Sequence, residues 1–118
     1  DLIAQHGADC WLVNTGWSGG AHGTGSRMAI AHTRALLAAA LDGTLARASY
    51  HSDPFFGLAI PDAVPGIPAG VLNPRDAWAD KAAYDTTARD LLGRFEKNFE
   101  KFAAYVGEDV RKVALKAK

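Results

Sequence analysis

The sequence predicts an α/β fold, and three features support this prediction. An apolar run at residues 10–14 is typical of a strand buried on both faces, and a glycine-rich loop follows it directly. A helix containing Thr33 and Arg34 comes next, and a periodic apolar stripe at residues 84–106 predicts a second, longer helix. A strand, a glycine loop and a helix in this order commonly bring backbone close to a phosphate or a nucleotide.

Glycines mark two helix ends in the first half of the chain. Residues 1–5 resemble the end of a helix that closes at Gly7, since glycine accepts the left-handed conformation of a helix C-terminus. The helix after the loop is expected to end at the Asp-Gly pair 42–43 for the same reason. Its start stays open, because residues 28–31 also fit a short extended segment, with the helix then beginning at His32 or Thr33.

The middle of the chain suggests short strands and a loop. Residues 46–51 and 56–60 suit short strands, and Asp53 with the following proline predicts a turn between them. Residues 61–75 are expected to form an irregular surface connection, because proline lacks the N–H that regular structure uses. The prolines concerned are Pro54, Pro61, Pro65, Pro68 and Pro74.

The stripe near the C-terminus is the most regular pattern in the sequence. Its apolar residues recur at spacings of three and four: Tyr84, Ala88, Leu91, Phe95, Phe99, Phe102 and Val106. We interpret the stripe as core packing of one amphipathic helix rather than as the wall of a cofactor site. Asp90 and Arg94 are four positions apart on the polar side and can pair. Residues 110–118 are expected to form a frayed basic tail.

Composition excludes several classes of protein. A chain of 118 residues can form one domain with a modest core, and 48% hydrophobic with 22% charged residues is ordinary for a soluble globular protein. A net charge of zero argues against a nucleic-acid binder. Cys10 is the only cysteine, which favours a reducing, cytoplasmic compartment. The sequence shows no secretory signal and no apolar run of about 18 residues, so neither export nor a membrane span is predicted.

The glycine loop does not match the two best-known nucleotide motifs. Gly20 and Gly25 have the G-x-x-x-x-G spacing of a phosphate loop, but Ser26 and Arg27 follow where a lysine is needed. A dinucleotide fingerprint fails as well, because Met28 stands where glycine or alanine is required. Two interpretations stay open: a mobile tight loop, or a loop whose backbone must approach a ligand or the body of the protein.

No metal site or catalytic triad is predicted. Neither the histidines nor the single cysteine have ligand-like spacing, and nothing places a nucleophile beside a base. The residues considered are His6, His22, His32, His51 and Cys10.

Four stretches of the sequence together resemble one enzyme family. CWLVNTGWSGG, GTGSRMAIAHTRALLAAALDGTL, DPFFGLAIPDAVPGIP and LNPRDAWADKAAYD occur in this order. They closely resemble the C-terminal part of ATP-dependent phosphoenolpyruvate carboxykinase, from about residue 3 to about residue 105. The resemblance implies that residues 1–109 are the C-terminal part of a mononucleotide-binding domain, with its upstream portion absent and a long amphipathic helix at its end. Residues 110–118 would be its tail.

The resemblance also implies which residues help bind ATP: Arg27, Met28 and Thr33. A guanidinium can stack on a purine or hold a phosphate. Met28 would offer an apolar wall and backbone groups to the adenine. Thr33 carries a hydroxyl that can donate or accept a hydrogen bond. Without the resemblance, Arg27 would be interpreted as a surface residue and Thr33 as a hydroxyl satisfying a backbone N–H at a helix start. Many members of the family have a lysine where this chain has Ser26, and an acidic or other polar residue where it has His32. Each difference lowers the local charge contrast.

The implied activity is the conversion of oxaloacetate and ATP to phosphoenolpyruvate, ADP and carbon dioxide in gluconeogenesis, with Mg²⁺ and Mn²⁺. The family's metal ligands, phosphate loop and substrate-binding arginines lie upstream of the matched segment, so no catalytic or metal-binding residue is expected here. The expected partners are ATP, oxaloacetate and the upstream part of the same polypeptide, with no nucleic acid and no membrane. The alternative is a non-catalytic nucleotide-binding or regulatory module derived from that enzyme. By itself the chain is expected to be inactive and poorly folded.

Overall fold

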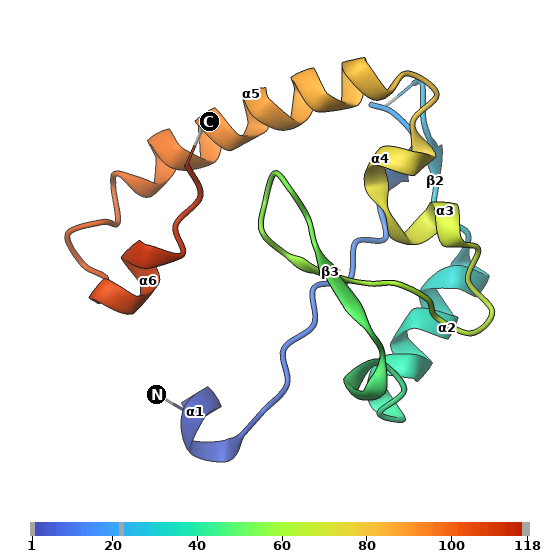
Figure 1. Cartoon of the computed structure of the whole chain (residues 1–118), viewed down its shortest axis with the longest axis horizontal. Helices are drawn as coiled ribbons and strands as arrows, with labels where there is room; N and C mark the ends of the chain where they lie inside the picture. The colour runs from blue at the N-terminus through green and yellow to red at the C-terminus, as the bar shows by residue number, and fades with distance from the viewer. Residues whose placement is uncertain (1, 22, 117–118) are drawn as a thin grey trace.

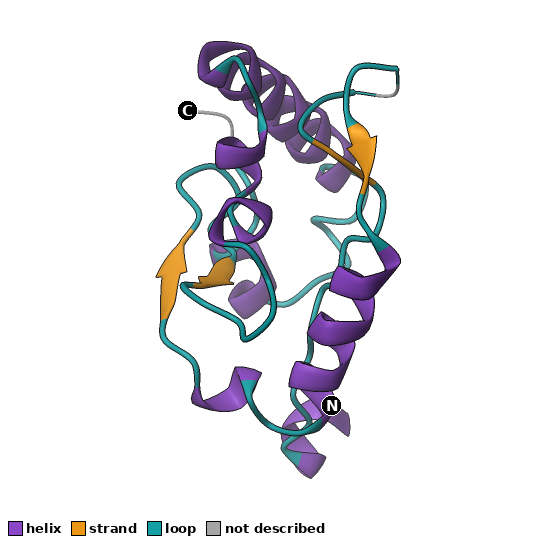
Figure 2. Cartoon of the chain, turned by 90° about the vertical axis from the view of Figure 1, so that its right-hand side faces the viewer, coloured by secondary structure: helices purple, strands orange, loops and turns teal. Residues whose placement is uncertain are grey.

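The computed structural model describes residues 2–21 and 23–116, and shows helices arranged around two small antiparallel ribbons (Figures 1 and 2). The predicted mixture of helices and strands is confirmed in this coarse form. The helices are α1 (Leu2–His6), α2 (Ile30–Leu41), the 3₁₀ turn η1 (Leu45–Arg47), α3 (Ala69–Leu72), α4 (Pro74–Ala77), α5 (Lys81–Phe99) and α6 (Glu108–Lys112). The strands are β1 (Trp17–Ser18), β2 (Ser26–Arg27), β3 (Tyr50–Ser52) and β4 (Ala59–Pro61).

The predicted buried strand at residues 10–14 is wrong. This stretch contains neither helix nor strand, and Leu12 is 84% exposed. A strand covered on both faces needs neighbouring elements on each side, and no described residue pairs with this stretch. Its one aromatic contact is Trp11, which stacks on Tyr50 with ring centroids 6.2 Å apart.

Both predicted helix ends in the first half are confirmed. After α1, Gly7 has a φ of +59°, and the N–H of Ala8 reaches back to the carbonyl of Ile3 at 3.3 Å. Helix α2 ends at Leu41, and Gly43 has a φ of +77°. Its start, which the sequence does not settle, lies at Ile30, ahead of the expected His32 or Thr33.

The strands in the middle of the chain are shorter than predicted. Residues 46 and 47 lie in η1, and β3 pairs with β4 through Tyr50↔Pro61, His51↔Ile60 and Ser52↔Ala59. The predicted turn is confirmed, since the buried carboxylate of Asp53 accepts the backbone N–H groups of Phe55 and Phe56. A short side chain that accepts local backbone N–H groups stabilises such a turn.

The prediction of an irregular connection at residues 61–75 is wrong in part, because it contains α3 and the start of α4. The side chain of Asn73 accepts the N–H of Arg75 at 3.2 Å and caps α4, whose first residue is Pro74. Proline fits there because the N–H that it lacks would have no partner in the helix.

The core is small, and one cluster of it lies between α2, η1 and residues 64–72. The buried side chains of this cluster are Ala39, Leu45 and Val64, with Leu36, Ala40, Ile67 and Leu72 packed around them. Tyr84, Ala88 and Leu92 of α5 are buried as well. The Cα radius of gyration is 15.9 Å, against about 13.5 Å for a compact domain of this length. Among the described residues no side chain is less than 2% exposed. The expectation of poor folding in isolation stays a prediction, and this small core supports it.

Helix α5 arches along one side of the molecule (Figure 1). Tyr84 and Ala88 of the predicted stripe are buried, but Phe95 is 47% exposed and Phe102 is 52% exposed. The interpretation as core packing therefore holds for the first half of α5 only. The helix ends at Phe99, before the end of the stripe. The predicted pair is present on its polar side, with Arg94 Nη2 2.8 Å from Asp90 Oδ2.

The C-terminal residues begin with the short helix α6, which overlaps the predicted tail. Ala117 and Lys118 lie outside the described residues, so the expected fraying is not tested there. Over residues 2–21 and 23–116, no helix has the length and apolar character of a transmembrane segment.

Candidate functional site

The glycine-rich segment folds as a hairpin. Strands β1 and β2 pair antiparallel, with Trp17 opposite Arg27. The N–H of Met28 donates to the carbonyl of Gly16 at 3.1 Å, which extends the pairing by one step. Within the loop, the carbonyl of Ala21 accepts two backbone N–H groups from the returning side, at 3.0 and 2.9 Å. His22, one of the histidines considered above, lies outside the described residues.

Two of the loop glycines are required by close contacts. A Cβ on Gly25 would lie 2.6 Å from the carbonyl oxygens of both Ser18 and Gly20. Gly19 has a φ of +80°, and a Cβ there would lie 2.8 Å from the carbonyl oxygen of Ala77. Of the two interpretations of the loop, the second fits Gly19, since its backbone approaches the body of the protein.

We expect Gly25→Ala to destabilise the hairpin, because the new methyl group must displace backbone rather than a flexible side chain. Overpacking of this kind costs about 1–3 kcal/mol. Thermal melts of the protein with and without this substitution would measure the loss of stability. Gly93→Ala is the control, since a Cβ there meets nothing within 4 Å. A melting temperature unchanged by Gly25→Ala would contradict the contact.

Arg27 lies on β2 with an exposed side chain. Among the described residues, its guanidinium has no ion pair, whereas Arg75 binds Asp85 and Arg94 binds Asp90. Arg27 can therefore bind an anion without giving up an internal salt bridge. Met28 is half-buried at the junction between β2 and α2.

Thr33 lies in the first turn of α2 and is half-buried. The N-cap residue is Ala29, which makes no side-chain cap, and the N–H of Thr33 already donates to the carbonyl of Ala29 at 3.2 Å. The interpretation of Thr33 as a helix-start cap is therefore wrong. No described residue accepts or donates a hydrogen bond at its hydroxyl.

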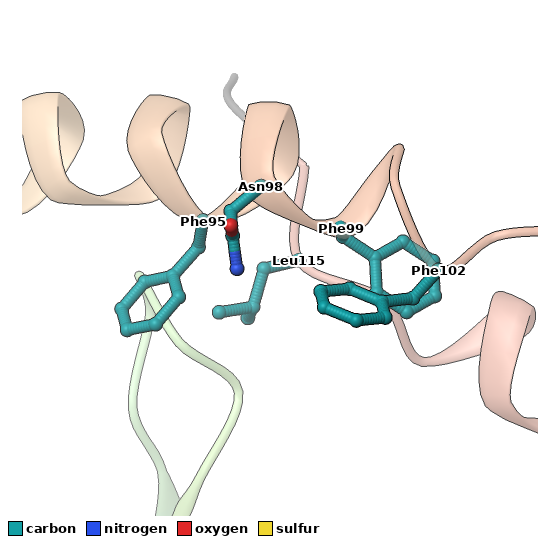
Figure 3. Close-up of a pocket in the computed structure, with 5 residues that line it drawn as sticks. All are labelled: Phe95, Asn98, Phe99, Phe102 and Leu115. Atoms are coloured by element: carbon teal, nitrogen blue, oxygen red, sulfur yellow. The ribbon is translucent and has the colours of Figure 1, made fainter.

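The three predicted residues share the short segment 27–33, and none of them lines either of two hollows found in the molecule. One hollow of about 80 Å³ lies between the β3–β4 hairpin and α4, beside Asp53 and Arg75. A second, of about 150 Å³, lies under the end of α5, where Leu115 points between Phe95 and Phe102 (Figure 3). Both are smaller than the roughly 300–1,000 Å³ of a ligand pocket. Neither hollow is therefore large enough to enclose a nucleotide.

The described residues do not form a metal centre. None of their His, Cys, Asp and Glu side chains gather in a group of three or more that could hold an ion. His51 is used in a pair across the second ribbon, with its Nδ1 2.7 Å from Asp62 Oδ1.

Sequence reasoning missed the part of the molecule on which the loop rests, which is the C-terminal end of α4. An asparagine followed by proline at residues 73–74 is a helix-start signal that could have predicted α4. Its contact with Gly19 joins segments far apart in the chain, and no local pattern predicts such a contact.

Comparison with known proteins agrees with the resemblance seen in the sequence. The family model described as phosphoenolpyruvate carboxykinase matches residues 1–70. Phosphoenolpyruvate carboxykinase (ATP) of Rhodopseudomonas palustris strain BisA53 is 58% identical over 118 residues, which is 100% of this chain and 22% of the relative. For strain TIE-1 the identity is 60% over 114 residues, covering 97% and 21%. The same enzyme of Geotalea uraniireducens strain Rf4 is 63% identical over 108 residues, covering 92% and 20%.

The chain therefore spans about one fifth of the length of these curated relatives. A family model that covers more than half of the chain, together with identities near 60% over almost all of it, shows that the chain belongs to the phosphoenolpyruvate carboxykinase family.

Proposed function

We propose that this chain is the C-terminal portion of an ATP-dependent phosphoenolpyruvate carboxykinase and supplies part of its ATP pocket. The observation that carries the proposal is the high identity, over nearly the whole chain, to relatives named phosphoenolpyruvate carboxykinase (ATP). The reaction of the complete protein is the conversion of oxaloacetate and ATP to phosphoenolpyruvate, ADP and carbon dioxide in the cytoplasm.

In this proposal, residues 1–109 complete a mononucleotide-binding domain that the upstream polypeptide begins. Helix α5 is its long amphipathic helix, and its half-exposed apolar side chains, Phe95 among them, are positions for contact with the missing part. Residues 110–118 form a tail. The open shape and the small core support the view that much of the packing surface lies outside this chain.

The ATP-binding residues of the chain are Arg27, Met28 and Thr33. The Arg27 guanidinium holds a phosphate or stacks on the purine, and its lack of an internal ion pair among the described residues supports this role. Met28 lies where β2 passes into α2 and provides an apolar surface to the adenine. The Thr33 hydroxyl, which has no hydrogen-bond partner within residues 2–21 and 23–116, bonds to the nucleotide.

Divalent metal ions, when bound to the complete enzyme, neutralise phosphate charge and polarise the reacting oxygens. The described residues of this chain do not fit such an ion, since they offer no group of carboxylate, histidine or cysteine ligands. The ligands for Mg²⁺ and Mn²⁺ therefore belong to the upstream polypeptide. The contribution of this chain to the reaction is to bind and orient ATP.

A chimeric enzyme tests the proposal. The matching segment of the Rhodopseudomonas palustris BisA53 enzyme is replaced by this chain, which is 58% identical to it. We expect the chimera to form phosphoenolpyruvate from oxaloacetate in an ATP-dependent manner, and the same enzyme with the segment deleted to form none. A chimera that melts and elutes like the parent but lacks this activity would contradict the proposal. It would favour the alternative, a non-catalytic module, if the chain still binds ATP.

A further inference from the structure

Lys81, the first residue of α5, binds the last turn of α4. Its Nζ donates hydrogen bonds to the carbonyl oxygens of Arg75 at 3.0 Å, Asp76 at 2.8 Å and Trp78 at 2.8 Å. An ammonium group has three protons to donate, and this geometry uses all three. The last carbonyls of a helix lack partners within the helix. Lys81 donates to the carbonyls of Asp76 and Trp78 and gives a second donor to that of Arg75, which also accepts the N–H of Trp78 at 3.3 Å.

The glycine loop packs against the same turn. Ala77, whose carbonyl oxygen would lie 2.8 Å from a Cβ on Gly19, stands in the sequence between two residues whose carbonyls Lys81 binds. The backbone of the loop thus meets α4 at the carbonyl that the lysine leaves unbound. The position of this turn therefore limits how closely the backbone at Gly19 can approach α4.

The pairing of β1 with β2 links the α4 turn to the residues proposed to bind ATP. Gly19 directly follows Ser18 of β1, Ser18 pairs with Ser26 of β2, and Arg27 and Met28 come next. A shift of the α4 turn would therefore move β2 through only a few bonded and hydrogen-bonded steps.

The attachment of α4 to α5 does not depend on Lys81 alone. Arg75 binds Asp85 through two parallel contacts, Nε to Oδ1 at 2.8 Å and Nη2 to Oδ2 at 3.0 Å. This ion pair raises the pKa of Arg75 and lowers the pKa of Asp85, mainly through the hydrogen bonds themselves. Removal of the Lys81 ammonium leaves these two contacts in place, so Arg75 stays attached to α5 while the carbonyls of Asp76 and Trp78 lose their donor.

We infer that Lys81 and Gly19 are positioning residues for the ATP site: Lys81 holds the end of α4, and Gly19 lets the glycine loop rest on it. Neither side chain is assigned a contact with the nucleotide. The inference deepens the proposed function and rests on it.

The test uses the chimeric full-length enzyme with Lys81→Met and Gly19→Ala. For Lys81→Met, we expect the KM and the directly measured Kd for ATP to rise about three- to ten-fold, which is the range for the loss of one ordinary hydrogen bond, since the effect on ATP is indirect. The KM for oxaloacetate at saturating ATP should stay within about two-fold. Gly19→Ala should give the same pattern. In the double variant, the rise in the Kd for ATP should be smaller than the product of the two single rises, since both substitutions act on one contact.

Lys97→Met is the matched control, because Lys97 is an exposed lysine of the same helix and its loss removes the same charge. It should leave both KM values unchanged. If Gly19→Ala does not fold, Lys81→Met and Lys81→Gln decide by themselves. A lower melting temperature with unchanged ATP affinity, or equal increases in both KM values, would overturn the inference.

Arg27→Ala separates this inference from the proposed function. If Arg27→Ala weakens ATP binding and Lys81→Met does not, the positioning role is wrong while the ATP site stands. If neither variant changes the affinity for ATP, the proposed site itself fails.

Discussion

The isolated 118-residue chain is expected to form no phosphoenolpyruvate above background when it is given oxaloacetate, ATP, Mg²⁺ and Mn²⁺. Its described residues hold no group of metal ligands, and the glycine loop has Ser26 and Arg27 where a phosphate loop needs lysine. The proposed ATP-binding residues line neither the hollow beside Asp53 nor the one under the end of α5. Phosphoryl transfer depends on metal ions and positioned cations, so the loss of activity should be complete rather than partial.

A coupled assay for phosphoenolpyruvate measures this result, with the chimeric enzyme as the positive control at the same molar concentration. Adding the upstream part of the Rhodopseudomonas palustris enzyme as a separate chain tests whether the two pieces complement one another. Metal-dependent turnover by the isolated chain would contradict the view that it contributes only part of a site.

Arg27→Ala in the chimeric enzyme is expected to lower the affinity for ATP by roughly ten- to a hundred-fold. A hydrogen bond to a charged group is worth about 1.5–3 kcal/mol. The full value is expected here because the described part of the chain offers Arg27 no internal ion pair to compensate. Thr33→Val keeps the shape and loses one neutral hydrogen bond, so a cost of about 0.5–1.5 kcal/mol is expected.

Direct titration of ATP, with thermal melts on the same samples, checks both variants. Oxaloacetate binding should change little in either one, since neither side chain is assigned to that substrate. Arg94→Ala is the matched control, because Arg94 forms an exposed ion pair on α5 and its removal deletes the same group. Unchanged ATP affinity in both Arg27→Ala and Thr33→Val would remove the site assignment.

Features set by the local chain can be predicted from the sequence. The end of α2 is predictable because Gly43 adopts a positive φ that other residues resist, and the turn at Asp53 because a short carboxylate can accept nearby N–H groups. The ion pair of Asp90 with Arg94 follows from helical spacing alone.

Features set by distant neighbours cannot be predicted in this way. Burial of residues 10–14 on both faces requires other strands, and an apolar run does not show whether they are present. The spacing of apolar residues up to Val106 shows which side chains can share a helix face, but not that α5 ends at Phe99. For the site, sequence resemblance alone supplied Arg27, Met28 and Thr33, while the contacts of Gly19 and Lys81 required the folded chain.

The tight contacts of Gly19 and Gly25 bear on how related sequences should be interpreted. Both glycines are required by oxygen atoms of this chain's own backbone. A descendant that had lost all use for nucleotide would still be under selection to keep them, because replacing either one strains the hairpin. Glycine content in this loop is therefore a marker of shared folding, whereas under the proposed function it is the loss of Arg27 that would mark a change in nucleotide binding.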